Sequence, residues 1–247
     1  MKTVLITGAN KGLGLALTET FANQNWHILM GVRNLERGQL AKNQLVKKGL
    51  KNLSLVQIDL SNPDSINDAS KNITENYSNL SLLINNAGIP GKESIGYKTT
   101  LPDLHETMQV NFFGTYQLIK NLEPLLNKNH GTIVNITIPT SPNHLWNPLA
   151  YKTSKGAQNI MTSSLGIWFE KEDQHILIYD IHPGVMSTDL NNHITGPFVH
   201  PTETIAQKIA DQILNHPHKN GDFVEIYKQI SDNFFTRFLA KHFAPKN

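Results

Sequence analysis

The chain has 247 residues, and its 22 lysines and arginines nearly balance its 20 aspartates and glutamates, so the formal net charge is +2. A chain this close to neutrality has no bulk charge with which to hold nucleic acid or an anionic membrane, and we do not expect nucleic acid as a partner. It contains no cysteine, which excludes disulfides, thiolate metal sites and a cysteine nucleophile and is compatible with a cytoplasmic location.

Short apolar runs alternate along the chain with longer amphipathic segments. The runs are β-branched or leucine-rich and apolar on both faces, a pattern typical of buried parallel strands. They predict strands at residues 3–7, 26–32, 53–59, 80–85, 132–138, 176–182 and 223–226. The amphipathic segments predict helices at residues 13–25, 35–48, 63–77, 104–127, 149–171 and 201–214. The alternation predicts an α/β fold, with a single domain built on one doubly wound parallel sheet and helices on both of its faces.

Two segments depart from this alternation. Residues 183–200 are rich in glycine, proline, asparagine and threonine and are longer than a routine connection, so we expect a substrate loop there, within a domain of residues 1–230. Residues 231–247 carry Phe235, Phe238 and Leu239 at helical spacing and predict a helical tail. Three roles stay open for the tail: packing on its own domain, an interface in a homo-oligomer, or binding to a membrane surface.

Neither a targeting signal nor a metal site is predicted. The N-terminal apolar run stops at Gly8, too early for a signal peptide, and no stretch approaches the ~18 apolar residues of a membrane span. The eleven histidines show no spacing typical of metal ligands. These observations favour a cytoplasmic protein without a membrane span or a bound metal.

A glycine-rich turn joins the first predicted strand to the first predicted helix. Its sequence, TGANKGLG over residues 7–14, allows a tight turn, a close approach of backbone amides to a pyrophosphate and close packing of the helix on the sheet. The helix N-terminus also favours the negative charge of a phosphate. The turn predicts a dinucleotide site, with an ordinary strand-to-helix turn as the simpler alternative. The residues assigned to the site here are Gly8, Asn10, Lys11, Gly12, Leu13 and Gly14.

The end of the second predicted strand indicates which dinucleotide is bound. An NAD site places a carboxylate there, about 20 residues past the glycines. This chain has Arg33 and Asn34 instead, and the Arg33 guanidinium can fork onto a 2′-phosphate. Lys11 can add a second positive charge. Either residue alone could be an ordinary surface cation, but both together, with the acid missing, predict NADP(H).

Polar and small residues also end the third and fourth predicted strands. Ligands of an open parallel sheet bind at the carboxyl ends of its strands, so these residues are assigned to the cofactor site as well. They are Asp59 and Leu60 after the third strand, and Asn86, Ala87 and Gly88 after the fourth. Two interpretations of Asp59 stay open: an acceptor for the adenine amine, or a carboxylate that caps its own loop.

Tyr151 and Lys155 lie four residues apart at the start of the fifth predicted helix and therefore share a helix face. A phenol titrates near pH 10, which makes it a poor proton shuttle at pH 7 unless a nearby ammonium stabilises the phenolate. A tyrosine and a lysine at this spacing are common by chance, so the pair alone is a weak signal.

Taken together, these motifs resemble the short-chain dehydrogenase/reductase family over nearly the whole chain, from Lys2 to Ile226. The glycine-rich turn and Arg33 look most like its NADPH-dependent carbonyl reductase branch. The motifs stand in the family's order: TGxxxGxG at 7–14, NNAG at 85–88, an asparagine at 111, YxxSK at 151–155 and a PG segment at 183–188. The resemblance implies a Rossmann-type fold and a small carbonyl or alcohol as substrate.

The resemblance also implies roles for individual residues. Tyr151 is the general acid/base, Lys155 binds the nicotinamide ribose, and Asn111 holds a water in the proton relay. Thr188 touches the nicotinamide carboxamide. The cofactor-binding residues of this last motif are Pro183, Gly184, Val185 and Thr188.

One position departs from the family pattern. The substrate-polarising serine lies thirteen residues before the tyrosine, and here that position is Ile138, which cannot donate a hydrogen bond. Thr137 points to the opposite strand face, which leaves Thr140 and Ser141 as candidate donors. Two functions therefore stay open: an NADPH-dependent oxidoreductase that reduces an aldehyde or ketone, or runs in reverse, and a catalytically weakened NADP(H)-binding sensor or partner protein.

Overall fold

The computed structural model describes residues 1–92, 96–141, 147–188, 190, 195–196 and 198–228. The predicted helical tail at 231–247 and six positions of the predicted substrate loop lie outside the described residues.

Seven strands of the described chain form one sheet in the order β3-β2-β1-β4-β5-β6-β7, and every neighbouring pair is parallel. The strands are β1 (Thr3–Thr7), β2 (His27–Val32), β3 (Leu53–Gln57), β4 (Leu80–Asn85), β5 (Thr132–Ile136), β6 (Leu177–His182) and β7 (Phe223–Glu225). The order reverses at β1, which pairs with β2 on one side and with β4 on the other. The predicted doubly wound parallel sheet is confirmed.

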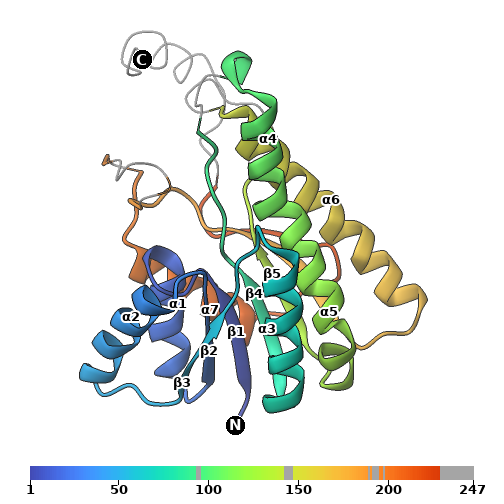
Figure 1. Ribbon diagram of the computed structural model, residues 1–247. Helices are drawn as coiled ribbons and strands as arrows, with labels where there is room; N and C mark the ends of the chain where they lie inside the picture. Colours follow the sequence, from blue (N-terminus) through green and yellow to red (C-terminus); the bar gives the residue numbers. More distant parts are fainter. Residues whose placement is uncertain (93–95, 142–146, 189, 191–194, 197, 229–247) are drawn as a thin grey trace.

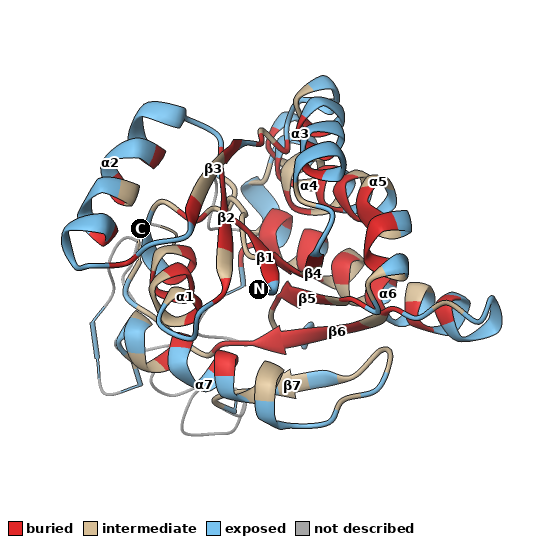
Figure 2. Ribbon diagram, turned by 90° about the horizontal axis from the view of Figure 1, so that it is seen from below, coloured by how far each residue is buried: buried red, intermediate tan, exposed pale blue. Residues whose placement is uncertain are grey.

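Helices cover both faces of the sheet (Figure 1). The helices are α1 (Gly12–Ala22), α2 (Leu35–Lys47), α3 (Pro63–Asn76), α4 (Leu101–Met108), α5 (Gly114–Lys128), α6 (Leu149–Lys171) and α7 (Thr202–Asn215). Apolar side chains of α1, α2 and α7 share one core with one face of the sheet, and those of α3, α5 and α6 share a second core with the other face. Figure 2 shows the buried strands between helices whose outer sides are exposed.

Side-chain caps start three of these helices. The Oδ1 of Asn34 accepts from the amide of Arg37 at the start of α2, and the Oδ1 of Asn62 accepts from the amide of Asp64 at the start of α3. Thr100 caps α4 in the same way. Each cap satisfies an amide that the first helical turn leaves without a partner.

The single helix predicted at 104–127 is wrong. Helix α4 already begins at Leu101, because Thr100 caps it and a proline occupies its first turn. A π-helical turn at Gln109–Phe113 then separates α4 from α5. Helix α5 begins at Gly114, where an added Cβ would lie 2.2 Å from the carbonyl oxygen of Leu60. The helix can approach the loop after β3 so closely only because position 114 has no side chain.

Candidate active site

The predicted site residues gather where the strands end, at the carboxyl edge of the sheet. The glycine-rich turn follows β1, Arg33 follows β2, Asp59 and Leu60 follow β3, and residues 86–88 follow β4. Tyr151 and Lys155 lie in the first two turns of α6, which follows β5. This is the edge at which an open parallel sheet binds its ligands.

Two positions of the glycine-rich turn have no room for a side chain. Gly8 has a φ of +68°, and an added Cβ would lie 3.2 Å from the Cα of Ala87. At Gly14 an added Cβ would lie 2.2 Å from the carbonyl oxygen of Gly8, so α1 packs directly on the turn. The side chain of the N-cap residue Lys11 does not cap α1, in contrast to the N-cap residues of α2, α3 and α4. The first amides of α1 are therefore placed to bind an anion, as a dinucleotide pyrophosphate requires.

Thr7 joins the glycine-rich turn to the segment after β4. Its Oγ1 accepts from the amides of Asn86 and Ala87, each at 3.0 Å, and its carbonyl oxygen accepts from the Nδ2 of Asn86 at 2.9 Å. These three bonds hold residues 86–88 against the turn, so the structure brings the first two sequence motifs together.

Asn111 lies in the π-helical turn and is fully buried. Its Oδ1 accepts from the amide of Ile89 at 2.8 Å, and its Nδ2 donates to the carbonyl oxygen of Ile89 and to the Oγ of Ser154, both at 2.9 Å. The Ser154 hydroxyl in turn donates to the carbonyl oxygen of Tyr151 at 2.8 Å. Both protons of the Asn111 amide group are thus used within the protein.

Tyr151 and Lys155 are both buried. The Nζ of Lys155 lies 5.9 Å from the centroid of the Tyr151 ring. It donates to the carbonyl oxygen of Ile136 at 2.7 Å and to the Oε1 of Gln158 at 2.9 Å. Burial raises the pKa of the Tyr151 phenol above its usual value and lowers the pKa of Lys155 to about 8. The two groups that the sequence paired by spacing therefore share one desolvated site.

The residues predicted to contact the adenosine half lie nearer the surface. Arg33 and Lys11 are exposed. The Oδ1 of Asp59 accepts from the amide of Ser61 at 2.9 Å and from its hydroxyl at 2.6 Å. Of the two interpretations of Asp59, loop capping is thus observed, and its contact with adenine stays a prediction.

The PG segment reaches back to the glycine-rich turn. An added Cβ at Gly12 would lie 3.6 Å from the Cγ2 of Thr188, so the first and last motifs meet. Gly184 has a φ of +88°, and an added Cβ would lie 2.9 Å from the Cβ of Tyr227. The Tyr227 ring also stacks on His200, with centroids 3.6 Å apart, and the amide of His200 donates to the carbonyl oxygen of Val185. Tyr227 and His200 thus fix the base of the predicted substrate loop. Neither residue belongs to a sequence motif, so neither of these contacts was predicted.

Residues 137–141 run along one flank of α6. Asn159 accepts from the hydroxyl of Thr137 and donates to the carbonyl oxygen of Ile138, at 3.0 Å in the second case. The Cγ2 of Thr140 lies 3.5 Å from where a Cβ of Gly156 would be, and the Nζ of Lys152 donates to the carbonyl oxygen of Ser141. Thr140 and Ser141 are exposed, whereas Ile138 is half-buried. The hydroxyl of Thr137 thus points toward α6.

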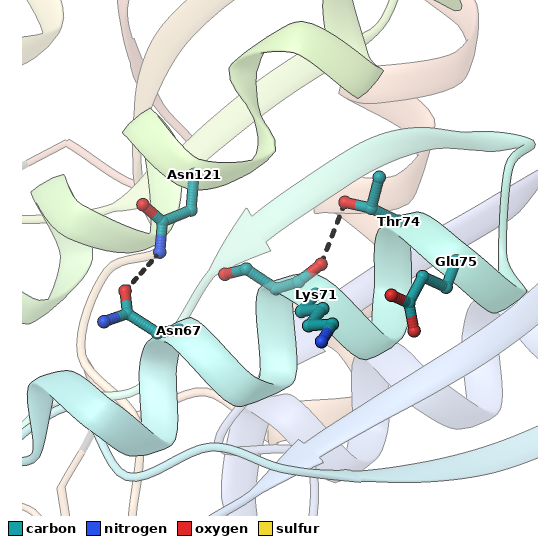
Figure 3. A pocket seen from close by; sticks show the side chains of 6 residues that line it. Asn67, Lys71, Thr74, Glu75 and Asn121 are labelled. Carbon is teal, nitrogen blue, oxygen red and sulfur yellow. Dashed lines mark hydrogen bonds between the residues drawn. The ribbon is translucent and has the colours of Figure 1, made fainter.

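A pocket on the outside of the molecule is separate from this edge. It is lined by Asn67, Ser70, Lys71, Thr74, Glu75 and Asn121 of α3 and α5 (Figure 3). The Nδ2 of Asn121 donates to the Oδ1 of Asn67 across it at 2.9 Å. None of the residues assigned to the cofactor or the chemistry lines this pocket.

The family model for short chain dehydrogenases matches residues 2–196. The chain belongs to this family. The resemblance seen in the motifs is confirmed, and the parallel sheet is of the Rossmann type that the family implies.

Similar proteins include dehydrogenases and reductases. The chain is 30% identical to "Estradiol 17-beta-dehydrogenase 2" of Mus musculus over 230 residues, which cover 92% of this chain and 56% of that protein. It is 37% identical to "Carbonyl reductase [NADPH] 1" of Mus musculus over 134 residues, which cover 54% of this chain and 47% of that protein. The chain thus spans little more than half the length of the first relative.

A solved structure shows the same fold at low identity. The NADPH-bound carbonyl reductase from chicken fatty liver superposes with a TM-score of 0.80 at 24% identity, over 91% of this chain and 96% of that one. Among the described residues of this short-chain dehydrogenase, no helix is long and apolar enough to cross a membrane. The same residues contain no group of three histidine, aspartate or glutamate side chains that could hold a metal ion.

Proposed function

We propose that this chain is an NADP(H)-dependent oxidoreductase that reduces a small aldehyde or ketone to an alcohol, or catalyses the reverse reaction. The observation that carries the proposal is the buried Tyr151–Lys155 pair at the carboxyl edge, linked through Ser154 to Asn111, in a short-chain dehydrogenase. When bound, the cofactor supplies or accepts the hydride.

The chain's own residues bind and orient the cofactor in this proposal. The glycine-rich turn and the N-terminus of α1 hold the pyrophosphate. Arg33 and Lys11 neutralise the 2′-phosphate, and Pro183, Gly184, Val185 and Thr188 lie against the nicotinamide half. The close approach of Thr188 to Gly12 supports this arrangement, because the segment proposed for the nicotinamide half then adjoins the turn proposed for the pyrophosphate.

Proton transfer is the part of the reaction that Tyr151 performs. Its hydroxyl donates a proton to the substrate oxygen during reduction and takes it back during oxidation. Since burial raises the pKa of this phenol, a positive charge nearby is needed to stabilise the phenolate. Lys155, whose pKa burial lowers to about 8, is predominantly an ammonium at pH 7 and supplies that charge.

The alternative of a binding module without turnover is less well supported. The relatives that match most of this chain carry the names of enzymes, and the proposed acid/base and lysine are both present. Ile138 is the one residue that favours the alternative, because it offers no hydrogen bond to a substrate oxygen.

Cofactor choice is the first test of the proposal. We expect NADPH to bind at least tenfold more tightly than NADH, which needs a difference of only about 1.4 kcal/mol. Fluorescence titration of both cofactors would measure it, and Arg33→Ala should bring the two affinities together. Lys47→Ala, which removes a cation from the far end of α2, is the matched control. Equal affinities in the wild type would contradict the assignment of NADP(H).

Turnover is the second test. NADPH consumption would be followed at 340 nm against a panel of aldehydes, ketones and quinones. Oxidation of NADPH by at least one class of carbonyl is expected. Tight NADPH binding with no turnover across the panel would favour the binding module.

We also propose that the protein acts in the cytoplasm, as one domain over residues 1–230, and that it forms a homo-oligomer. Exposed apolar side chains on α6 support the last point, because Ile160, Ile167 and Trp168 are 70%, 55% and 55% exposed on one flank of that helix. Light scattering of the purified protein would give its oligomeric state.

A further inference from the structure

A second row of polar side chains lies beneath the proposed acid/base, on the stripe of α6 that faces the sheet. Lys155, Gln158 and Thr162 follow one another at spacings of three and four residues, and all three are buried. Two buried polar residues of the sheet face them. These are Asn135 on β5 and Asp180 on β6, which are register partners in the parallel pair.

Hydrogen bonds connect this row to the Asp180 carboxyl. The Thr162 hydroxyl lies 2.6 Å from the Oδ1 of Asp180 and 3.1 Å from the carbonyl oxygen of Gln158. The Nδ2 of Asn135 donates to the same hydroxyl at 2.8 Å. Because the hydroxyl has one proton and already accepts from Asn135, the shorter contact assigns that proton to the carboxyl. Thr162 therefore holds Asp180 in place.

Charge balance points to Lys155 as the partner of Asp180. Lys155 is the one lysine or arginine among the buried residues of the described chain, and Asp180 is one of two buried acids. The other acid, Asp103, binds the backbone amide of Lys92 at 2.8 Å. A buried carboxylate without a cation is strongly disfavoured, and so is a buried ammonium without an anion. The Lys155 ammonium donates to Ile136 and Gln158 and makes no direct ion pair with Asp180, so the two charges act on one another across the row.

We propose that Asp180 is the counter-ion of Lys155, held by Thr162, and that Gln158 positions the ammonium through its Oε1. Asp180 and Gln158 are positioning residues in this proposal, since they act on the proposed reaction through Lys155 and touch neither cofactor nor substrate. The functional meaning of the pair rests on the proposed role of Lys155, whereas the pairing itself does not.

Burial moves the pKa of each group against its charged form: it lowers the pKa of Lys155 and raises the pKa of Asp180 to about 7. The charge of Asp180 opposes the first shift, and the hydrogen bonds of Thr162 and Asn135, together with the charge of Lys155, oppose the second. Removing the Asp180 charge should leave burial to lower the pKa of Lys155 further, so that the amine is neutral at mildly alkaline pH.

The other titratable groups around the row are few. Tyr151 lies on α6 itself, His182 lies on β6 on the same face of the sheet as Asp180, and Asp103 comes from α4, which packs on α6. The facing residues on β5, directly after β5 and in the π-helical turn are Asn135, Thr137 and Asn111, which do not titrate in this range.

The experiment measures the pKa of Lys155 directly, without turnover. The ε-carbon of Lys155 would be followed by NMR from pH 6 to 11 in protein with ¹³C-labelled lysine, with Lys155→Met assigning the signal. Asp180→Asn keeps the shape of the side chain and should lower the pKa of Lys155 by about 1 unit or more. Asp211→Asn, which removes a carboxylate from the surface of α7, should leave it unchanged.

A second substitution that restores a carboxylate beside Lys155 distinguishes an effect of charge from an effect of altered structure. Gln158→Glu in the Asp180→Asn background places a carboxylate where Oε1 now lies, 2.9 Å from the ammonium, and should return the pKa of Lys155 to its wild-type value or above. Should Asp180→Asn not fold, Thr162→Val tests the same proposal, because an unanchored carboxylate should also lower the pKa of Lys155. An unchanged pKa in a folded Asp180→Asn or Thr162→Val protein would overturn the proposal.

Enzyme assays distinguish this proposal from the proposed function. In a working oxidoreductase, Asp180→Asn should move the alkaline limb of the pH profile of kcat/KM toward lower pH, by the shift that NMR measures. If Asp180 had a structural role alone, Asp180→Asn would lower kcat/KM at every pH without moving the alkaline limb. That outcome would contradict the proposal. A shift of the lysine pKa in a protein without turnover would support the counter-ion and count against the proposed function alone.

Discussion

The proposed proton transfer depends on the hydroxyl group of Tyr151. We expect Tyr151→Phe to keep its NADPH affinity, because the ring that fills the buried site stays, and to lose at least ~10²-fold in turnover, the usual contribution of general acid–base catalysis. Steady-state kinetics and cofactor titration would be measured on the same preparation. Tyr116→Phe, which removes a hydroxyl from the partly exposed surface of α5, is the control. Unchanged turnover in Tyr151→Phe would place the chemistry elsewhere.

Ile138 is where this chain lacks a hydrogen-bond donor beside the proposed substrate site. One such donor typically contributes 10²–10³ in rate, so Ile138→Ser should raise turnover while NADPH affinity barely changes. The smaller side chain leaves a void that costs about 1–3 kcal/mol of stability, which thermal unfolding would detect.

Thr140→Val and Ser141→Ala are the companions of that variant. Both residues are exposed on the flank of α6, with the Thr140 methyl beside Gly156, so we expect each substitution to leave the rate nearly unchanged. A large loss in either variant, together with no gain in Ile138→Ser, would show that the missing donor is already replaced.

How far the sequence predicts such residues depends on what positions them. The spacing of Tyr151 and Lys155 is local, so a helix pattern suffices to place them on one face. Gln158 lies three residues after Lys155, so its contact with the ammonium is local in the same sense. Asp180 could not be assigned in this way, because its contact with Thr162 depends on the position of β6 in the sheet and on the rotation of α6 over it, and neither follows from local pattern.

At the scale of elements, glycine decides how closely α1 approaches the turn before it. Gly14→Ala would place its Cβ 2.2 Å from the carbonyl oxygen of Gly8, so the backbone must shift, at a cost of roughly 1–3 kcal/mol. Gly156→Ala is the matched control within a helix. Among the described residues its Cβ meets only the Thr140 methyl, at 3.5 Å, and the better helix propensity should stabilise the protein by about 0.5–1 kcal/mol.

Urea unfolding of both glycine variants would give the two changes. NADPH affinity should fall in Gly14→Ala, because the displaced turn carries the proposed pyrophosphate site. Equal stabilities for Gly14→Ala and the wild type would show that the turn adapts to a side chain.

The elements themselves were predicted better than their junctions. Every predicted strand and helix that falls in the described residues is present except the continuous helix at 104–127. Its early start could be read from Thr100 and the following proline, which are an N-cap and a first-turn residue. The π-helical turn could not, because it depends on the bonds of Asn111 to Ile89 and Ser154, far away in sequence.

At the scale of the whole molecule, apolar and polar side chains gather at different parts of the sheet. Its two faces are covered by apolar cores, while its carboxyl edge collects the polar groups proposed to bind the cofactor. The sheet interior nevertheless holds some titratable groups, such as Asp180 and His182. The stability of the fold should therefore respond to pH through a few buried side chains.

His182 supplies a pH dependence whose sign is fixed. Burial lowers the pKa of His182 below its usual value of 6.5, although a bond to the carbonyl oxygen of Thr137 and the charge of Glu225 oppose the shift. The unfolded chain then binds more protons than the folded one as the pH falls through 6.5, so this residue destabilises the fold in acid and has no such effect above pH 7.5. His182→Gln should lose less stability than the wild type between pH 7.5 and pH 5.

Urea unfolding at both pH values would measure this difference. His105→Gln removes a histidine from the exposed face of α4 and controls for the loss of a histidine as such. The comparison uses each protein's own change between the two pH values, so a constant packing loss in His182→Gln cancels. Asp180 acts in the opposite direction, because its raised pKa means that the folded state binds more protons between about pH 4 and 7. Equal acid losses in the wild type and His182→Gln would show that His182 is as readily protonated in the fold as in the unfolded chain.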